Sequence, residues 1–172
     1  MKYGIIAAVV CAVFALPAIA GDKDGDRDRK GDDLTAHLRA DNEIPPIATN
    51  ASGEFRAEIA DDEASISFTL TFSNLSANLV QSHIHFGQFF ANGGVSAFLC
   101  GGGAQPACPA ATSGTITGTI TAANVVGPAA QGIPAGGLAA LLEAIRDGET
   151  YVNVHDATFP AGEARGRVRV HR

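Results

Sequence analysis

The sequence carries little positive charge. It has 12 lysine and arginine residues against 18 aspartate and glutamate residues, a formal net charge of −6. A protein that binds nucleic acid needs a cationic surface to displace the counterions of the phosphate backbone. Nucleic acid is therefore excluded as an expected partner.

The sequence also lacks the short motifs that mark common enzyme classes. It contains no nucleophile elbow and no phosphate-binding loop, and no two carboxylates are spaced so that they would share one site. We therefore predict no catalytic residues, and expect a protein that binds rather than catalyses.

No long membrane-spanning segment is expected in the mature chain. The apolar run 5–16 is too short to span a bilayer comfortably. It follows Lys2 and precedes the small-x-small sequence Ala18-Ile19-Ala20, so residues 1–20 are interpreted as a secretory signal peptide, with a retained anchor as the alternative. We expect the protein to be secreted or periplasmic.

Residues 21–33 contain no apolar side chain that a core could bury. Their aspartates, lysines, arginines and glycines are typical of a solvated, disordered segment. We therefore predict a charged leader over 21–33 and one folded domain over 34–172.

Cysteine is scarce, and only two cysteines remain after the predicted signal peptide. Cys100 and Cys108 are separated by seven residues, three of them glycines. In an oxidising compartment such a pair favours a disulfide, which would stabilise the fold by roughly 2–3 kcal/mol in the chain-entropy model. A metal site made by the two thiols is the alternative, but no further cysteine supports it.

Most of the folded part alternates between apolar and polar residues. The clearest case is 64–72, where five apolar residues alternate with serine and threonine, which predicts a strand with one buried face. Other predicted strands are 34–40, 52–59, 79–86, 95–99, 114–121, 151–155 and 163–170. One helix is expected, because Leu138, Leu141, Leu142 and Ile145 are spaced i, i+3, i+4 and i+7 and Gly148 follows as a stop.

This pattern predicts an all-β fold. About eight strands with glycine- and proline-rich connections indicate an antiparallel Greek-key β-sandwich, immunoglobulin-like or copper–zinc superoxide dismutase-like, with one short helix.

Three of the five histidines lie in two of the predicted strands. Because strand side chains alternate, His83 and His85 share the face opposite Ile84, and His155 shares a face with Asn153, opposite Val152 and Val154. If the strands are neighbours, the three imidazoles converge and can bind copper or zinc. Asn153, Asp156 or Glu163 would then orient the imidazole N–H groups.

The alternative is that these histidines are half-buried structural residues, bonded to carboxylates or backbone. His37 and His171 are predicted to lie on the surface.

The last strand carries three arginines on one face, Arg165, Arg167 and Arg169. Such a row favours a charged edge strand that prevents sheet-to-sheet association; the alternative is that it binds an anion or a glycan. For Arg165 we expect an ion pair with a carboxylate of a neighbouring strand.

Four motifs in order resemble the CHRD domain, the module named for chordin that also occurs singly in secreted bacterial proteins. They are Leu38-x-x-x-Asn42-Glu43-Ile44-Pro45-Pro46, His83-Ile-His85-x-Gly87, Tyr151-Val-Asn-Val-His155 and Phe159-Pro-x-Gly-Glu163-Ala-Arg165-Gly166. The resemblance covers about 34–170 and implies an immunoglobulin-like or related β-sandwich. It implies no settled activity, and the growth-factor partners of chordin-type proteins are not carried over.

The His83-x-His85 run is also similar to the copper-ligand strand of copper–zinc superoxide dismutases. Those enzymes need a bridging histidine and a zinc subloop, and no histidine lies between His85 and His155. A dismutase is therefore disfavoured. We expect a secreted or periplasmic module that binds an extracellular or periplasmic protein or glycan without catalysis; the alternative is a copper- or zinc-binding protein.

The first prediction concerns processing. Exported protein is expected to begin near Gly21 and to carry one disulfide. The intact mass of protein recovered from the medium or periplasm, before and after thiol alkylation, measures both. An uncleaved N-terminus or alkylation of both cysteines without reduction would contradict the prediction.

Overall fold

The computed structural model describes residues 32–171. The predicted signal peptide and nearly all of the predicted leader lie outside the described residues. Asp32 and Asp33, which the sequence assigned to the leader, belong to the fold: Asp33 begins the first strand, and Asp32 is 2.8 Å from Arg146 in an ion pair. Among the described residues, no helix has the length and apolar character needed to cross a bilayer.

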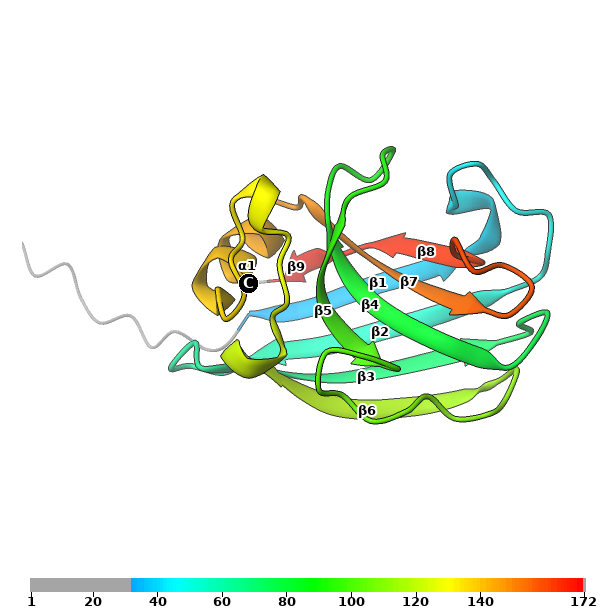
Figure 1. Ribbon diagram of the computed structural model, residues 1–172, viewed down its shortest axis with the longest axis horizontal. Coiled ribbons are helices and arrows are strands. Elements are labelled where there is room, and N and C mark those ends of the chain that lie inside the picture. Colours follow the sequence, from blue (N-terminus) through cyan, green and yellow to red (C-terminus); the bar gives the residue numbers. More distant parts are fainter. Residues whose placement is uncertain (1–31, 172) are drawn as a thin grey trace, which may run out of the picture.

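The described chain forms nine strands, three short 3-10 helices and one α-helix (Figure 1). In chain order these are β1 (Asp33–Arg39), η1 (Ala40–Asn42), β2 (Ser52–Ile59), β3 (Ser65–Ser73), β4 (Leu79–Phe86), β5 (Gly94–Cys100), β6 (Gly114–Thr121), η2 (Ala122–Asn124), η3 (Ala129–Gln131), α1 (Leu138–Arg146), β7 (Thr150–Asp156), β8 (Ala164–Arg167) and β9 (Arg169–His171).

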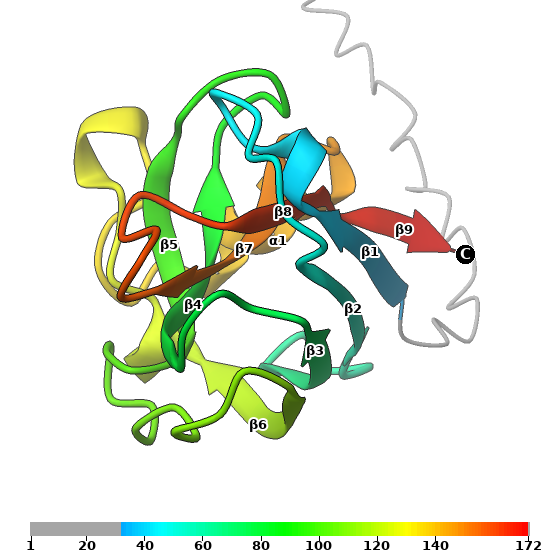
Figure 2. The ribbon, with the colours of Figure 1, turned by 90° about the vertical axis from the view of Figure 1, so that its right-hand side faces the viewer.

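All the described strands belong to one antiparallel sheet. Its order is β5-β4-β7-β8-β1-β2-β3-β6, and β9 pairs with β1. The two ends of this order approach each other, because Ala97 in β5 forms an isolated bridge with Val125, just after η2. The sheet is therefore nearly closed, and the end view shows its strands around a common core (Figure 2). The prediction of an antiparallel all-β fold with one short helix is confirmed, in a form between sandwich and barrel.

The register of β3 is the predicted one. Ile66, Phe68, Leu70 and Phe72 are at most 4% exposed, whereas the serines and threonines between them face outward. Phe68 stacks on Phe55 of β2 with ring centroids 6.2 Å apart. The period-two pattern thus fixes which face of this strand joins the core.

Helix α1 covers one end of the barrel. Leu138, Leu141, Leu142 and Ile145 are all buried in the core, as their helical spacing predicted. The chain leaves the helix through Gly148, whose φ of +71° is a left-handed conformation that glycine adopts without steric cost.

The interpretation of 163–170 as one charged edge strand is wrong. The strand breaks at Val168, whose side chain is 1% exposed and whose N–H donates to the carbonyl of Thr150. Before the break, β8 lies between β7 and β1 and is not an edge. Arg165 is therefore buried at 1% exposure, whereas Arg167 and Arg169 are exposed.

The disulfide between Cys100 and Cys108 is formed, with Cα atoms 5.0 Å apart. It closes the glycine-rich loop that follows β5. The loop backbone lies against the ring of Phe98. The approach is so close that a Cβ at Gly102 would come within 2.5 Å of that ring. The disulfide loop thus holds an aromatic side chain of β5 in place.

The second prediction concerns the core. Truncating Phe68 to alanine is expected to lower the free energy of unfolding by about 3–5 kcal/mol, because the ring is 4% exposed and its loss leaves a cavity. Urea unfolding followed by circular dichroism measures the change. Ser67→Ala, on the exposed face of the same strand, is the matched control and should stay within about 0.5 kcal/mol of the parent. Equal losses in the two variants would contradict this packing.

Candidate metal centre

Adjacent strands β4 and β7 bring the three predicted histidines together. In the antiparallel register Gln81 is opposite His155, His83 is opposite Asn153, and His85 is opposite Tyr151. All three histidines therefore lie on the same face of the sheet. His83 and His85 are two residues apart in β4, and His155 of β7 is the diagonal neighbour of His83. The three histidines converge only because β4 pairs with β7, a strand that begins about 65 residues after β4 ends. No local feature of the sequence specifies that pairing.

One ligand nitrogen from each ring lies within 4.8 Å of those of the other two. The ring centroids of His83 are 4.7 Å from His85 and 4.4 Å from His155, and those of His85 and His155 are 6.4 Å apart. A Zn–N or Cu–N bond is about 2.0–2.1 Å long, so nitrogens around one ion lie roughly 3–4 Å apart. Small side-chain movements would bring the three rings to that spacing.

The histidine face is more deeply buried than predicted. Ile84, Val152 and Val154 form the core on the opposite face, as expected. The sequence suggested half-buried histidines at most, yet His83, His85 and His155 are only 3%, 8% and 8% exposed. The reason is that loops, which the alternation does not describe, cover this face of β4 and β7.

The covering loops also fix the orientation of two imidazole rings. His85 Nδ1 lies 2.8 Å from the carbonyl oxygen of Gly93, and His155 Nδ1 lies 3.1 Å from that of Pro160. A carbonyl oxygen only accepts, so each Nδ1 carries the proton that it donates. In a neutral ring this leaves the Nε2 lone pair free, which is the arrangement found in metal-binding histidines.

Asn153 stands between the two free lone pairs. Its Oδ1 lies 3.1 Å from His85 Nε2 and 2.8 Å from His155 Nε2. An amide oxygen cannot donate to a lone pair, so these contacts need either a cation among the three groups or a turned amide that presents its NH₂. Nδ1 of His83 is buried with no hydrogen-bond partner. The two Nε2 atoms and Asn153 Oδ1 are thus acceptors that face one another without a proton donor or a cation between them.

Burial keeps the imidazoles neutral. Desolvation, followed by repulsion from His155 and His85, lowers the pKa of His83 to about 2. Desolvation lowers the pKa of His155 to about 4, and it also lowers the pKa of His85. Neutral imidazole is the form that binds metal ions, so no proton has to leave before coordination at neutral pH.

A buried ion pair lies beside the histidines. Arg165 of β8 donates to Glu43 at 2.7 Å, and the two side chains are 2% and 3% exposed. The predicted ion pair of Arg165 is present, but its partner comes from the loop after η1 rather than from a strand. Desolvation raises the pKa of Glu43, with Arg165 opposing that shift.

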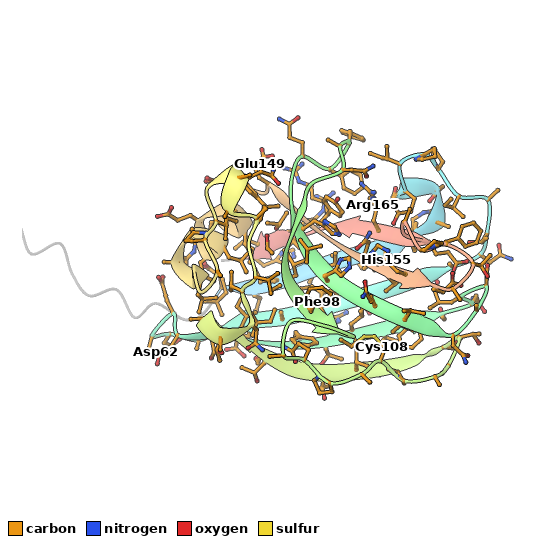
Figure 3. All side chains as sticks on the ribbon, in the orientation of Figure 1. Asp62, Phe98, Cys108, Glu149, His155 and Arg165 are labelled. Carbon is orange, nitrogen blue, oxygen red and sulfur yellow. A yellow bond between two sulfur atoms is a disulfide. The ribbon has the colours of Figure 1, made fainter. Side chains whose placement is uncertain are left out.

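Arg165 also connects the ion pair to the histidines; Figure 3 labels Arg165 and His155. Its guanidinium lies 4.5 Å from the ring centroid of Tyr151, and that ring stacks on His85 at 4.7 Å. It donates to Asn92 Oδ1 at 2.7 Å and to the carbonyl of Ala91, which hold the loop between β4 and β5.

The other predicted orienting groups bind elsewhere. Glu163 accepts from the backbone N–H and the hydroxyl of Ser76, and Asp156 accepts from backbone N–H groups that include Thr158 and Phe159. Neither contacts an imidazole in the described hydrogen bonds. Asn153 is the predicted residue that does. His37 and His171, predicted to be superficial, are exposed.

Sequence reasoning missed three residues around the cluster. Glu43 was visible only as part of the Asn42–Pro46 motif, and Tyr151 as a residue on the histidine face of its strand. Phe98 carried no signal, yet its ring lies edge-on to His83 with centroids 5.1 Å apart.

The turn before β8 must contain a glycine to leave room for this site. Gly162 has φ of +123°, and a Cβ there would lie 2.7 Å from Glu43 Oε1 and 3.0 Å from Asn153 Nδ2. The absent side chain is what lets the carboxylate and the amide approach the turn.

The described chain is thus an antiparallel β-domain with three converging, buried histidines on two neighbouring strands. The family model of the CHRD domain matches residues 34–168, from β1 to the break before β9. The chain belongs to the CHRD domain family. Searches among curated proteins and among solved structures found no match.

The third prediction concerns pH. Well above pH 6.5 the three histidines are neutral in both the folded and the unfolded chain. Below it the unfolded chain binds protons that the folded cluster does not, so stability is lost as the pH falls. For His155 alone the loss is about 1.4 kcal/mol per pH unit between its unfolded pKa of about 6.5 and its folded pKa of about 4.

Urea unfolding of metal-free protein at pH 7.5, 6.0 and 5.0 measures this dependence. His155→Gln should flatten the profile, whereas His37→Gln, at an exposed histidine outside the cluster, should leave the slope unchanged. A wild-type stability that stays constant from pH 7.5 to 5.0 would refute the buried neutral state.

Proposed function

We propose that this CHRD domain is a non-catalytic metal-binding module that acts outside the cytoplasm and holds one copper or zinc ion through His83, His85 and His155. The observation that carries the proposal is the convergence of three neutral imidazoles. Two of them have Nδ1 fixed by a backbone carbonyl, which directs Nε2 toward the shared centre.

The donor chemistry narrows the choice of ion. Calcium and magnesium prefer oxygen ligands, whereas imidazole suits zinc and copper. Three histidines with one position left open are a known ligand set for zinc. Asn153 Oδ1 lies next to Nε2 of two of the rings and therefore faces the position of the ion itself.

The disulfide supports a location outside the cytoplasm. Disulfides persist in oxidising compartments and are rare in the cytosol, and Cys100 and Cys108 are joined. Secretion or export to the periplasm is the proposal that accommodates this bond together with the signal-like residues 1–20.

A second candidate function is an interaction module for an extracellular protein or glycan. The observation in its favour is Phe90, which is 86% exposed in the loop between β4 and β5. An aromatic ring displayed on a loop that Arg165 anchors is suited to contact a partner. Phe90→Ser would weaken such an interaction without changing metal binding.

The fourth prediction tests the metal site. Untagged protein, stripped with a chelator and titrated with copper or zinc, is expected to bind one ion per chain. Replacing any one of His83, His85 or His155 by glutamine should weaken binding at least 100-fold, because one of three ligands is lost. Asn153→Ala should weaken it about 10–100-fold, since it removes an oxygen that faces the ion but leaves the three imidazole ligands in place.

His37→Gln and His171→Gln are the matched controls, because both residues are exposed histidines outside the cluster. Both should bind like the parent. Binding that survives all three cluster variants, or no stoichiometric binding by the parent, would reject the metal function.

A further inference from the structure

We infer that the histidine cluster is built for copper in its reduced state, Cu(I), rather than for Cu(II) or Zn(II). The inference rests on the proposed metal function and adds to it the charge of the ion. It follows from the charges, the burial and the number of ligands around the three rings.

The donor set carries no negative charge. It consists of three histidines, without a carboxylate or a thiolate among the grouped ligand atoms. Asp156 and Glu163 direct their oxygens to backbone amides and to Ser76 rather than to the rings. A bound ion would therefore keep its full charge, apart from what the imidazoles donate.

Two carboxylates lie near the cluster: Asp156 of β7 accepts from backbone N–H groups, and Glu43 is already balanced by a cation. Glu43 forms its ion pair with Arg165, and both side chains are almost fully buried. Arg165 moreover lies against Tyr151, which stacks on His85. The nearest cation is thus one aromatic ring away from a metal ligand and opposes further positive charge.

Because the site is buried, the charge of the ion determines how much free energy is lost when the ion leaves water. The three histidines are at most 8% exposed, and Phe98 lies edge-on to His83. The cost of transferring an ion from water into such a site is large, and in the Born treatment it grows with the square of the charge. A doubly charged ion therefore loses about four times as much hydration free energy as Cu(I) on the same basis.

The number of ligands favours the same ion. Structural zinc is almost always bound by four ligands, and Cu(II) favours square-planar or tetragonal sites, so both would need at least one further ligand beside the three imidazoles. Cu(I) is stable with three ligands in a plane. The cluster supplies three imidazole nitrogens, and the one further donor atom beside them is the neutral amide oxygen of Asn153, a hard ligand that soft Cu(I) does not need.

Competition titrations of the untagged, disulfide-bonded protein test the inference. Cu(I) is kept reduced by ascorbate without oxygen and competed with bicinchoninate; Cu(II) and Zn(II) are competed with chelators of known affinity. We expect Cu(I) to bind at least 100-fold more tightly than Cu(II). A preference of that size raises the potential of the bound couple by about 120 mV above the aqueous couple.

Two variants at Phe98 isolate the effect of charge. Phe98→Glu places a carboxylate beside His83, and Phe98→Gln removes the ring without adding charge. Relative to Phe98→Gln, Phe98→Glu is expected to reduce the preference for Cu(I) over Cu(II) at least tenfold. Phe90→Glu, on the exposed loop residue, is the control and should leave the preference unchanged.

The outcomes are distinguishable. If the parent binds none of the three ions, the proposed function itself fails. If Zn(II) or Cu(II) binds stoichiometrically and at least as tightly as Cu(I), the metal function stands and this inference is overturned. Equal preferences in folded Phe98→Glu and Phe98→Gln overturn the charge argument. If circular dichroism shows that Phe98→Glu does not fold, the reduction potential of copper bound to the parent protein is the test. A potential that is not above that of the aqueous couple overturns the inference.

Discussion

The buried pair between Arg165 and Glu43 is the interaction on which this end of the molecule depends. Removing one partner of a buried ion pair typically costs about 3–5 kcal/mol, because the other charge is left without compensation. Here the same guanidinium also holds Asn92 in the loop over the histidines and covers the ring of Tyr151. One arginine therefore ties η1, β7, β8 and the covering loop into one unit.

Strand positions and side-chain faces could be predicted from the sequence, because they depend on a period of two. The buried face of β3 and the shared face of His83 and His85 follow directly from it. The break at Val168 and the depth of the histidines could not be predicted, since they depend on which strands become neighbours and on how loops fold over them. The pairing of Arg165 with Glu43, 122 residues apart, is of the same kind.

The histidine cluster departs from the rules that the rest of the domain follows. Most buried positions elsewhere are apolar, whereas this face of β4 and β7 buries three imidazoles, an amide and a phenol side by side, with Nδ1 of His83 unpaired. Such an arrangement lowers stability in the metal-free state, most of all in acid. Natural proteins retain local violations of this sort mainly where function requires them.

Gly162 makes the histidine cluster depend on the turn before β8. Any side chain there would push against Glu43 and against the amide of Asn153, to which two imidazoles are bound. A substitution in this turn would thus alter the histidine face of the sheet while leaving every histidine in the sequence. Within the family, a chain that keeps all three histidines but lacks this glycine would be a poor candidate for the same ligand.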